Sequence, residues 1–295
     1  MHIQRGAWAE INLDAVAHNV QMAKANLKPT TKLCAVVKAD AYGHGAVRVA
    51  QEAARNGADF FAVALLQEGV KLREVGIETP ILVLGSMLPE VAEICVRYDI
   101  SHAVFDEERL YALNAAALKL HTKAKIHIKI DTGMHRIGVH VRDAGRFAKL
   151  AASLPGIYIE GVFSHFATAD ADDKQYAAYQ FERFQEALRL IEAEGVHIPI
   201  RHIANSAALT ELQEYQLDMV RQGITLYGLH PAHMIDCYKD FEPVMTVKTQ
   251  VAFVKTLPPG ETIGYGRTYT LTRPSVIATV PIGYADGVSR RLSNR

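Results

Sequence analysis

Residues 33–65 read LCAVVKADAYGHGAVRVAQEAARNGADFFAVAL. Two short apolar runs, 33–39 and 59–65, flank a segment with helical periodicity at 45–56. Each run is too short for a typical helix and is rich in β-branched or aromatic residues, which predicts a buried strand. Two such strands joined by a helix form a βαβ unit, which is typical of a parallel sheet.

The same alternation continues along the chain to about residue 228. Further strand-like runs are PILVLGS (80–86), SHAVF (101–105), KIHIKID (125–131), YIEGVFSH (158–165), IPIRHIAN (198–205) and DMVRQGITLYG (218–228). About eight strands separated by helical stretches, with a helix at 11–27 left to close the ring, predict an α/β fold. We expect a (βα)8 TIM-type barrel over residues 1–230, and an open doubly wound sheet is the alternative.

The pattern changes after residue 231, where no long helical period is found. The runs 244–257, 262–272 and 275–285 are predicted to be strands. They indicate a mainly antiparallel β domain over residues 231–295, with which the first ten or so residues are expected to pack. About three strands make a marginal sheet, so we expect this domain to be incomplete.

Composition narrows the class of protein. The chain has 295 residues, and its 32 Lys and Arg balance its 32 Asp and Glu, which argues against nucleic acid or an anionic membrane as a partner. No apolar run approaches the roughly 20 residues of a membrane span, and the N-terminus lacks the apolar core of a signal peptide. Cys34, Cys95 and Cys237 are far apart, so neither a disulfide framework nor a metal site is expected. We predict a cytoplasmic enzyme or small-molecule binder.

Polar residues gather where the predicted strands end, and this is where barrel enzymes place their active sites. The candidates are Lys38, Lys129, Arg136, His165, Asn205, Ser206, Arg221, Gly223 and Ile224. Taken singly, each has a plainer alternative. Lys38 could extend to solvent, and His165 could be a hydrogen-bonded structural residue. Arg136 and Arg221 could each pair with a neighbouring Asp.

The combination of residue types favours a phosphorylated aldehyde. The amine of Lys38, if its pKa is lowered, can form a Schiff base with an aldehyde. The loops at 205–206 and 223–224 follow the last two strands, where barrels often bind phosphate. Pyridoxal phosphate fits both features, and a class I aldolase is the neighbouring alternative. Tyr265 and Tyr284 are either general bases or ordinary edge-strand tyrosines.

Six motifs, in this order, resemble those of the bacterial alanine racemases, which are pyridoxal-phosphate enzymes of fold type III. They are AVVKADAYGHG (35–45), HIKIDTGMHRIG (127–138), EGVFSHF (160–166), HIANS (202–206), RQGITLYG (221–228) and GYGRTY (264–269). The first of them is long and specific. The resemblance extends over the whole chain.

The resemblance implies that two bases act on opposite faces of the substrate. Lys38 would hold pyridoxal phosphate as a Schiff base and serve as one base. Tyr265 would be the other, supplied across the interface of a homodimer. The cofactor and its phosphate would further be bound by Tyr42, Asn205, Ser206, Gly223 and Ile224.

The resemblance also implies roles for residues around the cofactor ring. Arg221 would face the pyridine nitrogen, and His165 would lie near the ring and link Tyr265 to Arg221. Arg136 would contact the phenolic oxygen and the substrate, braced by Lys129, which is carbamylated in many family members. Tyr284 would line the entry of the substrate.

The implied reaction is the interconversion of L-alanine and D-alanine, which supplies D-alanine for peptidoglycan. The alternatives are a racemase for serine or a broader range of amino acids, and a pyridoxal-phosphate-binding barrel protein without catalysis. Family members normally continue beyond the position of Arg295. We therefore expect a chain that is shortened at its C-terminus and weakly active.

Overall fold

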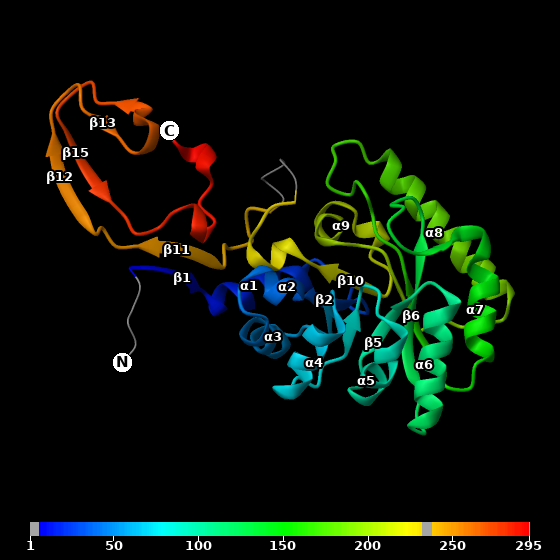
Figure 1. The fold of residues 1–295 in the computed structure, drawn as a ribbon. Coiled ribbons are helices and arrows are strands. Elements are labelled where there is room, and N and C mark those ends of the chain that lie inside the picture. The colour runs from blue at the N-terminus through cyan, green and yellow to red at the C-terminus, as the bar shows by residue number, and fades with distance from the viewer. Residues whose placement is uncertain (1–5, 232–237, 295) are drawn as a thin grey trace. The chain divides into compact units, whose positions relative to one another are not determined.

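Among the described residues, eight parallel strands form the centre of the larger of two units (Figure 1). The structure is a computed structural model that describes residues 6–231 and 238–294. The larger unit runs from Asn12 to Val244, and the smaller one combines the described residues up to Ile11 with those from Met245 onward. None of the described helices is long and apolar enough to cross a membrane.

The eight strands form a nearly closed ring in which all pairs are parallel. They are β2 (Lys32–Val36), β3 (Phe60–Val63), β4 (Ile81–Val83), β5 (Ser101–Val104), β6 (Ala124–Asp131), β8 (Ile157–Phe163), β9 (Ile200–His202) and β10 (Met219–Gln222). The order is β10-β2-β3-β4-β5-β6-β8-β9, and β7 (Val139–His140) pairs with β6. Backbone bonds from Asp218 to Arg201 and from Arg221 to Ala204 join β9 to β10. The predicted barrel is confirmed, and the open sheet is excluded.

Helices follow the strands in alternation. They are α1 (Leu13–Ala25), α2 (Lys38–Tyr42), α3 (Ala46–Arg55), α4 (Leu66–Glu74), α5 (Ala92–Arg97), α6 (Glu107–Lys119), α7 (Ala144–Ser153), α8 (Gln175–Ala193) and α9 (Ser206–Glu211). Short 3-10 turns are η1 (Pro89–Val91), η2 (Val141–Asp143), η3 (Gln213–Tyr215) and η4 (Ile224–Tyr227). The side chains of Asn12, Asp106 and Asn205 accept backbone N–H bonds where α1, α6 and α9 begin, which fixes those starts.

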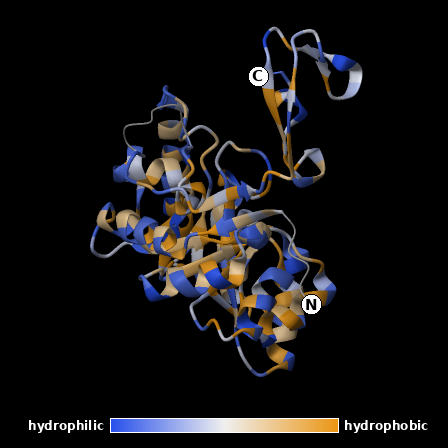
Figure 2. Ribbon diagram, turned by 90° about the vertical axis from the view of Figure 1, so that its left-hand side faces the viewer, coloured by the Kyte–Doolittle hydropathy of each residue, from blue (hydrophilic) through white to orange (hydrophobic). Residues whose placement is uncertain are grey.

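The strands are apolar because both of their faces are buried. One hydrophobic cluster joins Cys34, Val36, Phe60, Ala62, Leu82, Ile200 and Met219 from five strands. Hydrophobic residues gather on the strands of this unit, and hydrophilic residues lie on its outer helices (Figure 2). Burial of each large apolar side chain contributes about 1.5–3 kcal/mol, so the ring provides a rigid base for the residues at its rim.

Residues 238–244 group with the barrel unit, whereas the sequence suggested a border near residue 230. Hydrogen bonds explain this grouping. The side chain of Asn19 on α1 donates to the backbone oxygen of Glu242 and accepts from its N–H. The backbone N–H of Asn12 also donates to Val244. These bonds tie the segment to α1.

The described residues of the smaller unit form three antiparallel strand pairs. Its strands are β1 (Ala7–Ile11), β11 (Met245–Thr249), β12 (Phe253–Leu257), β13 (Thr262–Ile263), β14 (Tyr269–Thr270) and β15 (Ser275–Thr279). The pairs are β1 with β11, β12 with β15 and β13 with β14. The turns η5 (Tyr265–Arg267), η6 (Tyr284–Asp286) and η7 (Arg290–Leu292) complete it. The predicted antiparallel character is confirmed.

The predicted strands of this unit were too long. The run 244–257 divides into two strands because Gln250 still bonds Gly6, while Ala252 bonds Thr279 on a different partner strand. The run 262–272 is interrupted by positive φ angles at Gly264, Gly266 and Arg267, which turn the chain. The run 275–285 ends as a strand at Thr279.

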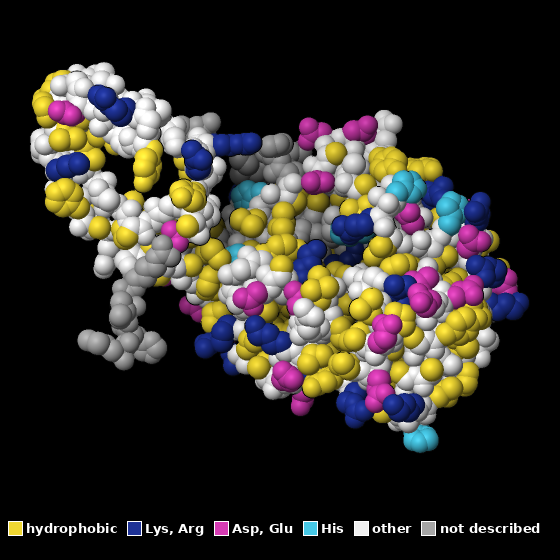
Figure 3. Space-filling view, in the orientation of Figure 1, with side chains coloured by type: hydrophobic (Ala, Val, Ile, Leu, Met, Phe, Trp, Pro, Cys, Tyr) yellow, Lys and Arg dark blue, Asp and Glu magenta, His cyan; other side chains and the backbone are white. Residues whose placement is uncertain are grey.

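Many apolar side chains of the smaller unit are exposed (Figure 3). They are Val247, Val251, Phe253, Val254, Tyr265, Tyr269, Val276, Val280, Tyr284 and Leu292. Two-stranded pairs have too little surface to cover these side chains, and this explains their exposure.

Candidate active site

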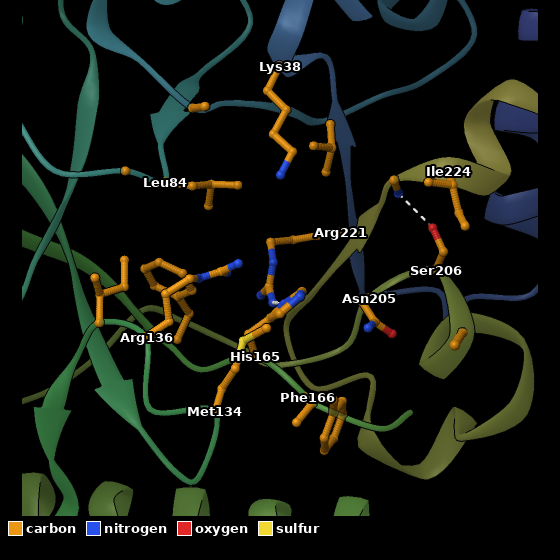
Figure 4. A pocket seen from close by; sticks show the side chains of 18 of the residues that line it. Lys38, Leu84, Met134, Arg136, His165, Phe166, Asn205, Ser206, Arg221 and Ile224 are labelled. Atoms are coloured by element: carbon orange, nitrogen blue, oxygen red, sulfur yellow. Dashed lines mark hydrogen bonds between the residues drawn. The ribbon is translucent and has the colours of Figure 1, made fainter. Parts of the chain in front are cut away.

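A cavity of about 600 Å³ lies at the carboxyl ends of the barrel strands. Its walls come from the ends of β2, β6, β8 and β10 and from the segments that follow β2, β3, β4, β6, β8, β9 and β10. Figure 4 shows most of the side chains that line it. Ten of the residues singled out in the sequence line it: Lys38, Tyr42, Lys129, Arg136, His165, Asn205, Ser206, Arg221, Gly223 and Ile224. The structure therefore brings together residues that are up to 186 positions apart.

Lys38 begins a turn of unusual handedness. The next four residues, Ala39 to Tyr42, all have φ between 52° and 55°. A left-handed conformation costs an L-residue roughly 1–2 kcal/mol, so a run of four needs support from its surroundings. Glu68 on α4 accepts the N–H of Ala39 at 2.6 Å, and Asp40 accepts the N–H of Ala46 at 3.0 Å.

The amine of Lys38 points into the cavity, toward Arg221 and His165 (Figure 4). Burial lowers the pKa of Lys38 from its ordinary value, and the nearby Arg136 lowers it further, while Glu68 acts in the opposite direction. A lowered pKa increases the fraction of neutral amine, which is the nucleophilic and basic form. The alternative of a lysine that merely extends to solvent does not fit this half-buried position.

Hydroxyl groups and backbone N–H groups converge at one end of the cavity. Ser206 accepts the N–H of Gly223 at 2.8 Å, and the hydroxyl of Thr225 lies 3.2 Å from the same oxygen. A β-carbon added to Gly223 would lie 3.5 Å from the Ser206 oxygen and 3.8 Å from the Tyr42 hydroxyl. The backbone of Gly223 thus lies open between two hydroxyls, which suits a phosphate.

Arg221 is only 3% exposed and is held by several acceptors. Its Nη1 donates to Nδ1 of His202 at 2.8 Å, and its Nη2 donates to Nδ1 of His165 at 3.0 Å and to the backbone oxygens of Ser164 and Ile203. Burial lowers the pKa of both histidines well below the ordinary value, and the charge of Arg221 adds to this effect. Both rings are therefore neutral, with the proton on Nε2.

Lys129 is buried, and its Nζ donates to the backbone oxygen of Ile130 at 2.9 Å. Burial, followed by the charge of Arg221, lowers the pKa of Lys129 to about 7. Within the described part of the chain, neither Arg136 nor Arg221 forms an ion pair with a carboxylate, because Asp131 bonds His135 and Gly133 instead. The plain salt-bridge alternative is thus excluded for the described residues.

The cavity as a whole is positive. Lys38, Lys129, Arg136 and Arg221 line it, and Asp170 is the one acidic side chain among the lining residues described. Such a balance favours an anionic ligand.

Tyr265 and Tyr284 belong to the other unit. Tyr265 is fully exposed and lies in η5, between Gly264 and Gly266, so it is not an edge-strand tyrosine. Tyr284 is 77% exposed and begins η6. Both residues are therefore largely exposed.

Several walls of the cavity were not predicted. They include Leu84, Gly85, Ser86, Met134, Ile137, Phe163, Phe166 and Asp170. Most are apolar or small, and such residues carry no chemical pattern that separates them from an ordinary strand end. Only the position of 84–86, at the end of the predicted strand 80–86, could have indicated some of them.

Two family descriptions match this chain. The model for the alanine racemase N-terminal domain matches residues 11–231, and the model for the C-terminal domain matches residues 244–295. An alanine racemase of Desulfovibrio desulfuricans is 46% identical over 291 residues, which cover 99% of this chain and 78% of the relative. An alanine racemase of Halothermothrix orenii is also 46% identical, over 99% of this chain and 77% of the relative.

Solved structures are similar over the same range. The alanine racemase of Clostridium difficile 630 superposes with a TM-score of 0.92 at 40% identity and covers 98% of this chain and 76% of its own. The alanine racemase of Bacillus anthracis with bound L-Ala-P has a TM-score of 0.90 at 38% identity, over 99% and 76% of the two chains.

Proposed function

This chain belongs to the alanine racemase family, and from that premise we propose that it interconverts L-alanine and D-alanine with pyridoxal 5′-phosphate as cofactor. The observation that carries the proposal is the lysine amine of lowered pKa that points into a positive cavity with a phosphate cradle. When bound, the cofactor supplies an aldehyde for an amine and an electron-withdrawing ring that acidifies the α-hydrogen of an amino acid.

The residues present fit that cofactor. Ser206, Gly223, Ile224 and Tyr42 would hold the phosphate through hydroxyl and N–H groups, with Asn205 beside them. Lys38 would hold the aldehyde carbon through its Nζ. The spacing of hydroxyl oxygens around the bare backbone of Gly223 supports this assignment.

Arg221 would face the pyridine nitrogen of the cofactor. A guanidinium does not give up its proton in proteins, so it donates a hydrogen bond to the nitrogen without protonating it. This weakens the withdrawal of electrons by the ring and limits side reactions such as transamination. The proton-bearing Nε2 of His165, fixed by Arg221 on the other ring nitrogen, would donate toward the second base.

Racemisation requires a base and an acid on opposite faces of the α-carbon. Lys38 Nζ would exchange the proton on one face, and the phenolic oxygen of Tyr265 would exchange it on the other. Tyr265 would come from the second subunit of a homodimer, and Tyr284 would line the substrate entry. The full exposure of Tyr265 supports a role in which its partner groups belong to another copy.

Lys129 and Arg136 would act together. A lysine with a pKa of about 7 is largely neutral at slightly alkaline pH, and its amine can add to CO2, releasing a proton and leaving a carbamate. The negative carbamate would then orient Arg136 toward the cofactor oxygen and the substrate carboxylate. The surplus of positive charge in the cavity supports such a modification. We further infer that the enzyme acts in the cytoplasm and supplies D-alanine for peptidoglycan.

The test is reduction by borohydride in the presence of pyridoxal phosphate. We expect a new absorption band that borohydride removes, with the label found by mass spectrometry on the peptide containing Lys38. The Lys38→Ala variant should show no label. The Lys32→Ala variant, changed at the exposed start of β2, the strand that precedes Lys38, should behave like the wild type. Label on another lysine, or none on a folded sample, would refute the proposal.

Substrate choice is tested by turnover. We expect α-hydrogen exchange of alanine in D2O to be much faster with the enzyme than with free pyridoxal phosphate, and faster for alanine than for serine. Exchange at the rate of the free cofactor would support the non-catalytic alternative, and equal rates would support a broad racemase.

A further inference from the structure

The barrel interior below the cavity contains polar groups that the proposed function does not use. His127 on β6 and His202 on β9 have no exposed surface, and the side chain of Glu160 on β8 is only 13% exposed. Buried polar groups are costly unless they are hydrogen-bonded, so their partners need explanation.

These groups form one hydrogen-bonded chain that begins at Arg221. Arg221 Nη1 lies 2.8 Å from His202 Nδ1, and His202 Nε2 lies 2.9 Å from His127 Nδ1. His127 Nε2 then lies 3.0 Å from Glu160 Oε2, which also accepts the hydroxyl proton of Ser101. The chain crosses the barrel interior from β10 to β5.

The two ends of the chain fix its direction. A guanidinium can only donate, and an ionised carboxylate can only accept. His202 must therefore accept at Nδ1 and donate from Nε2, and His127 must do the same. Since an arginine does not release its proton, the chain cannot conduct protons to the cavity, and what it can do is hold groups in place.

The strands are shaped around this chain. A β-carbon on Gly161 would lie 2.4 Å from Nδ1 of His127, so only glycine leaves room for the ring. The register of β6 and β8 shifts between Ile126 and His127, because Glu160 is an extra residue of β8 between the partners Ile159 and Gly161. On the other side, Phe163 stacks on His202 with ring centroids 4.9 Å apart and an angle of 8°.

The chain also links two opposite charges. Among the described residues, no carboxylate contacts Arg221. Three other cationic side chains line the same cavity, those of Lys38, Lys129 and Arg136. Burial alone would raise the pKa of Glu160, but hydrogen bonds from His127 and Ser101 bring it below the ordinary value. Glu160 is therefore ionised, and it is the negative end of the chain.

We propose that Glu160 is a positioning residue for Arg221, acting through His127 and His202. The carboxylate holds both imidazoles in one tautomer, and the second imidazole holds Nη1 of Arg221, so that the guanidinium keeps one orientation at the cofactor ring. The inference rests on the proposed function only for the part that Arg221 plays at the ring. The chain itself is a property of the protein without cofactor.

The first measurement is the set of histidine 15N chemical shifts of the whole 295-residue protein, with and without pyridoxal phosphate. We expect His127 and His202 to show an unprotonated Nδ1 and a protonated Nε2. In Glu160→Gln, which keeps the shape and removes the charge, the signals of both histidines should shift. Asp59→Asn is the control: this carboxylate bonds Lys24 and Leu33 and is not part of the hydrogen-bonded chain, so its loss should shift neither histidine signal.

Function is measured on the same variants. At metal sites, loss of the hydrogen-bond partner of a ligating histidine typically lowers metal affinity or activity 10–100-fold. By analogy, we expect kcat of Glu160→Gln to fall roughly tenfold at unchanged KM. The absorption band of the bound cofactor should shift, while borohydride still labels Lys38. Ser101→Ala, a milder change at the far end of the chain, should move the histidine signals and kcat in the same direction if Glu160→Gln does not fold.

Two results would overturn the proposal. One is a shift at His127 that does not extend to His202, which would mean that no orientation is passed on. The other is shifted histidine signals with kcat and absorption band unchanged, which would reduce the chain to a structural network. Failure of the wild type to bind pyridoxal phosphate would instead refute the proposed function, while the histidine shifts would still decide whether the chain exists.

Discussion

The barrel unit and the smaller unit contain the two proposed bases in opposite environments. Lys38 follows a strand whose neighbours are buried on both faces, and its amine is half-buried among groups of the same unit. Tyr265 lies in a turn between two-residue strands and is fully exposed. Packing within the barrel unit lowers the pKa of Lys38, whereas Tyr265 has no such packing around it.

This difference shows that the two units support their proposed catalytic side chains in different ways. A ring of eight strands can fix a side chain and shift its pKa, because many buried contacts support it. Three separate strand pairs present a side chain but leave its surroundings to another surface. The exposed apolar residues of the smaller unit fit such a surface, which in the proposed dimer is a second copy.

The largest effect is expected for Tyr265→Phe. Removal of one general acid–base group should lower the rate of racemisation by about 10²–10⁴-fold. Because the change removes only a hydroxyl and no packing within the chain, the melting temperature should stay nearly the same. Turnover from L-alanine and from D-alanine, together with thermal unfolding, measures both. Tyr269→Phe, also exposed in the same unit, is the control, and an equal loss of rate there would contradict the assigned role.

The next effect concerns stability. Leu82 is fully buried in the barrel cluster, and Leu82→Ala should lower the free energy of unfolding by about 2–5 kcal/mol through lost burial and a cavity. Val276 is 69% exposed on β15, and Val276→Ala should change it by less than about 0.5 kcal/mol. Urea unfolding at low protein concentration measures both. A large loss for Val276→Ala would show that another surface covers this face.

The fold of the barrel unit could be predicted from the sequence because a strand buried on both faces is a continuous apolar run. The smaller unit was predicted less well. Its exposed strands contain apolar and polar residues with only rough alternation, and the break at 250–252 follows from a change of partner strand, which no local pattern encodes. The left-handed run at 39–42 was also beyond prediction, because only Glu68 and the surrounding fold enforce it.

The cavity could be predicted in part for a related reason. Charged and hydroxyl residues near the ends of apolar runs are conspicuous, and they make up most of the ten predicted residues that meet in the structure. His127, His202 and Glu160 lie inside strands, where a polar residue is usually just a satisfied core group. Their connection depends on the register between neighbouring strands, including the irregularity at Glu160, and no local sequence pattern encodes it.

A smaller effect is expected from the titration of Lys129. In the folded protein its pKa is about 7, against an ordinary value of 10.5, so between these values the unfolded chain binds a proton that the folded chain lacks. Stability should therefore rise with pH above 7, by at most about 1.4 kcal/mol per pH unit. Unfolding of the wild type and Lys129→Met at pH 7 and pH 9, in buffers free of CO2, measures the difference. Identical pH dependence of the two proteins would contradict the buried amine.

The smallest effect tests the support of Lys38 itself. Ala39 is exposed and left-handed, and glycine there removes roughly 1–2 kcal/mol of strain but adds about 0.5–1 kcal/mol of unfolded-chain entropy. Ala39→Gly should therefore stabilise the protein by about 0.5–1 kcal/mol in urea unfolding. Ala115→Gly, at an exposed position of the right-handed helix α6, should destabilise it by about 1 kcal/mol. Since the substitution is the same, opposite signs isolate backbone handedness, and equal losses would mean that the turn after Lys38 is not strained.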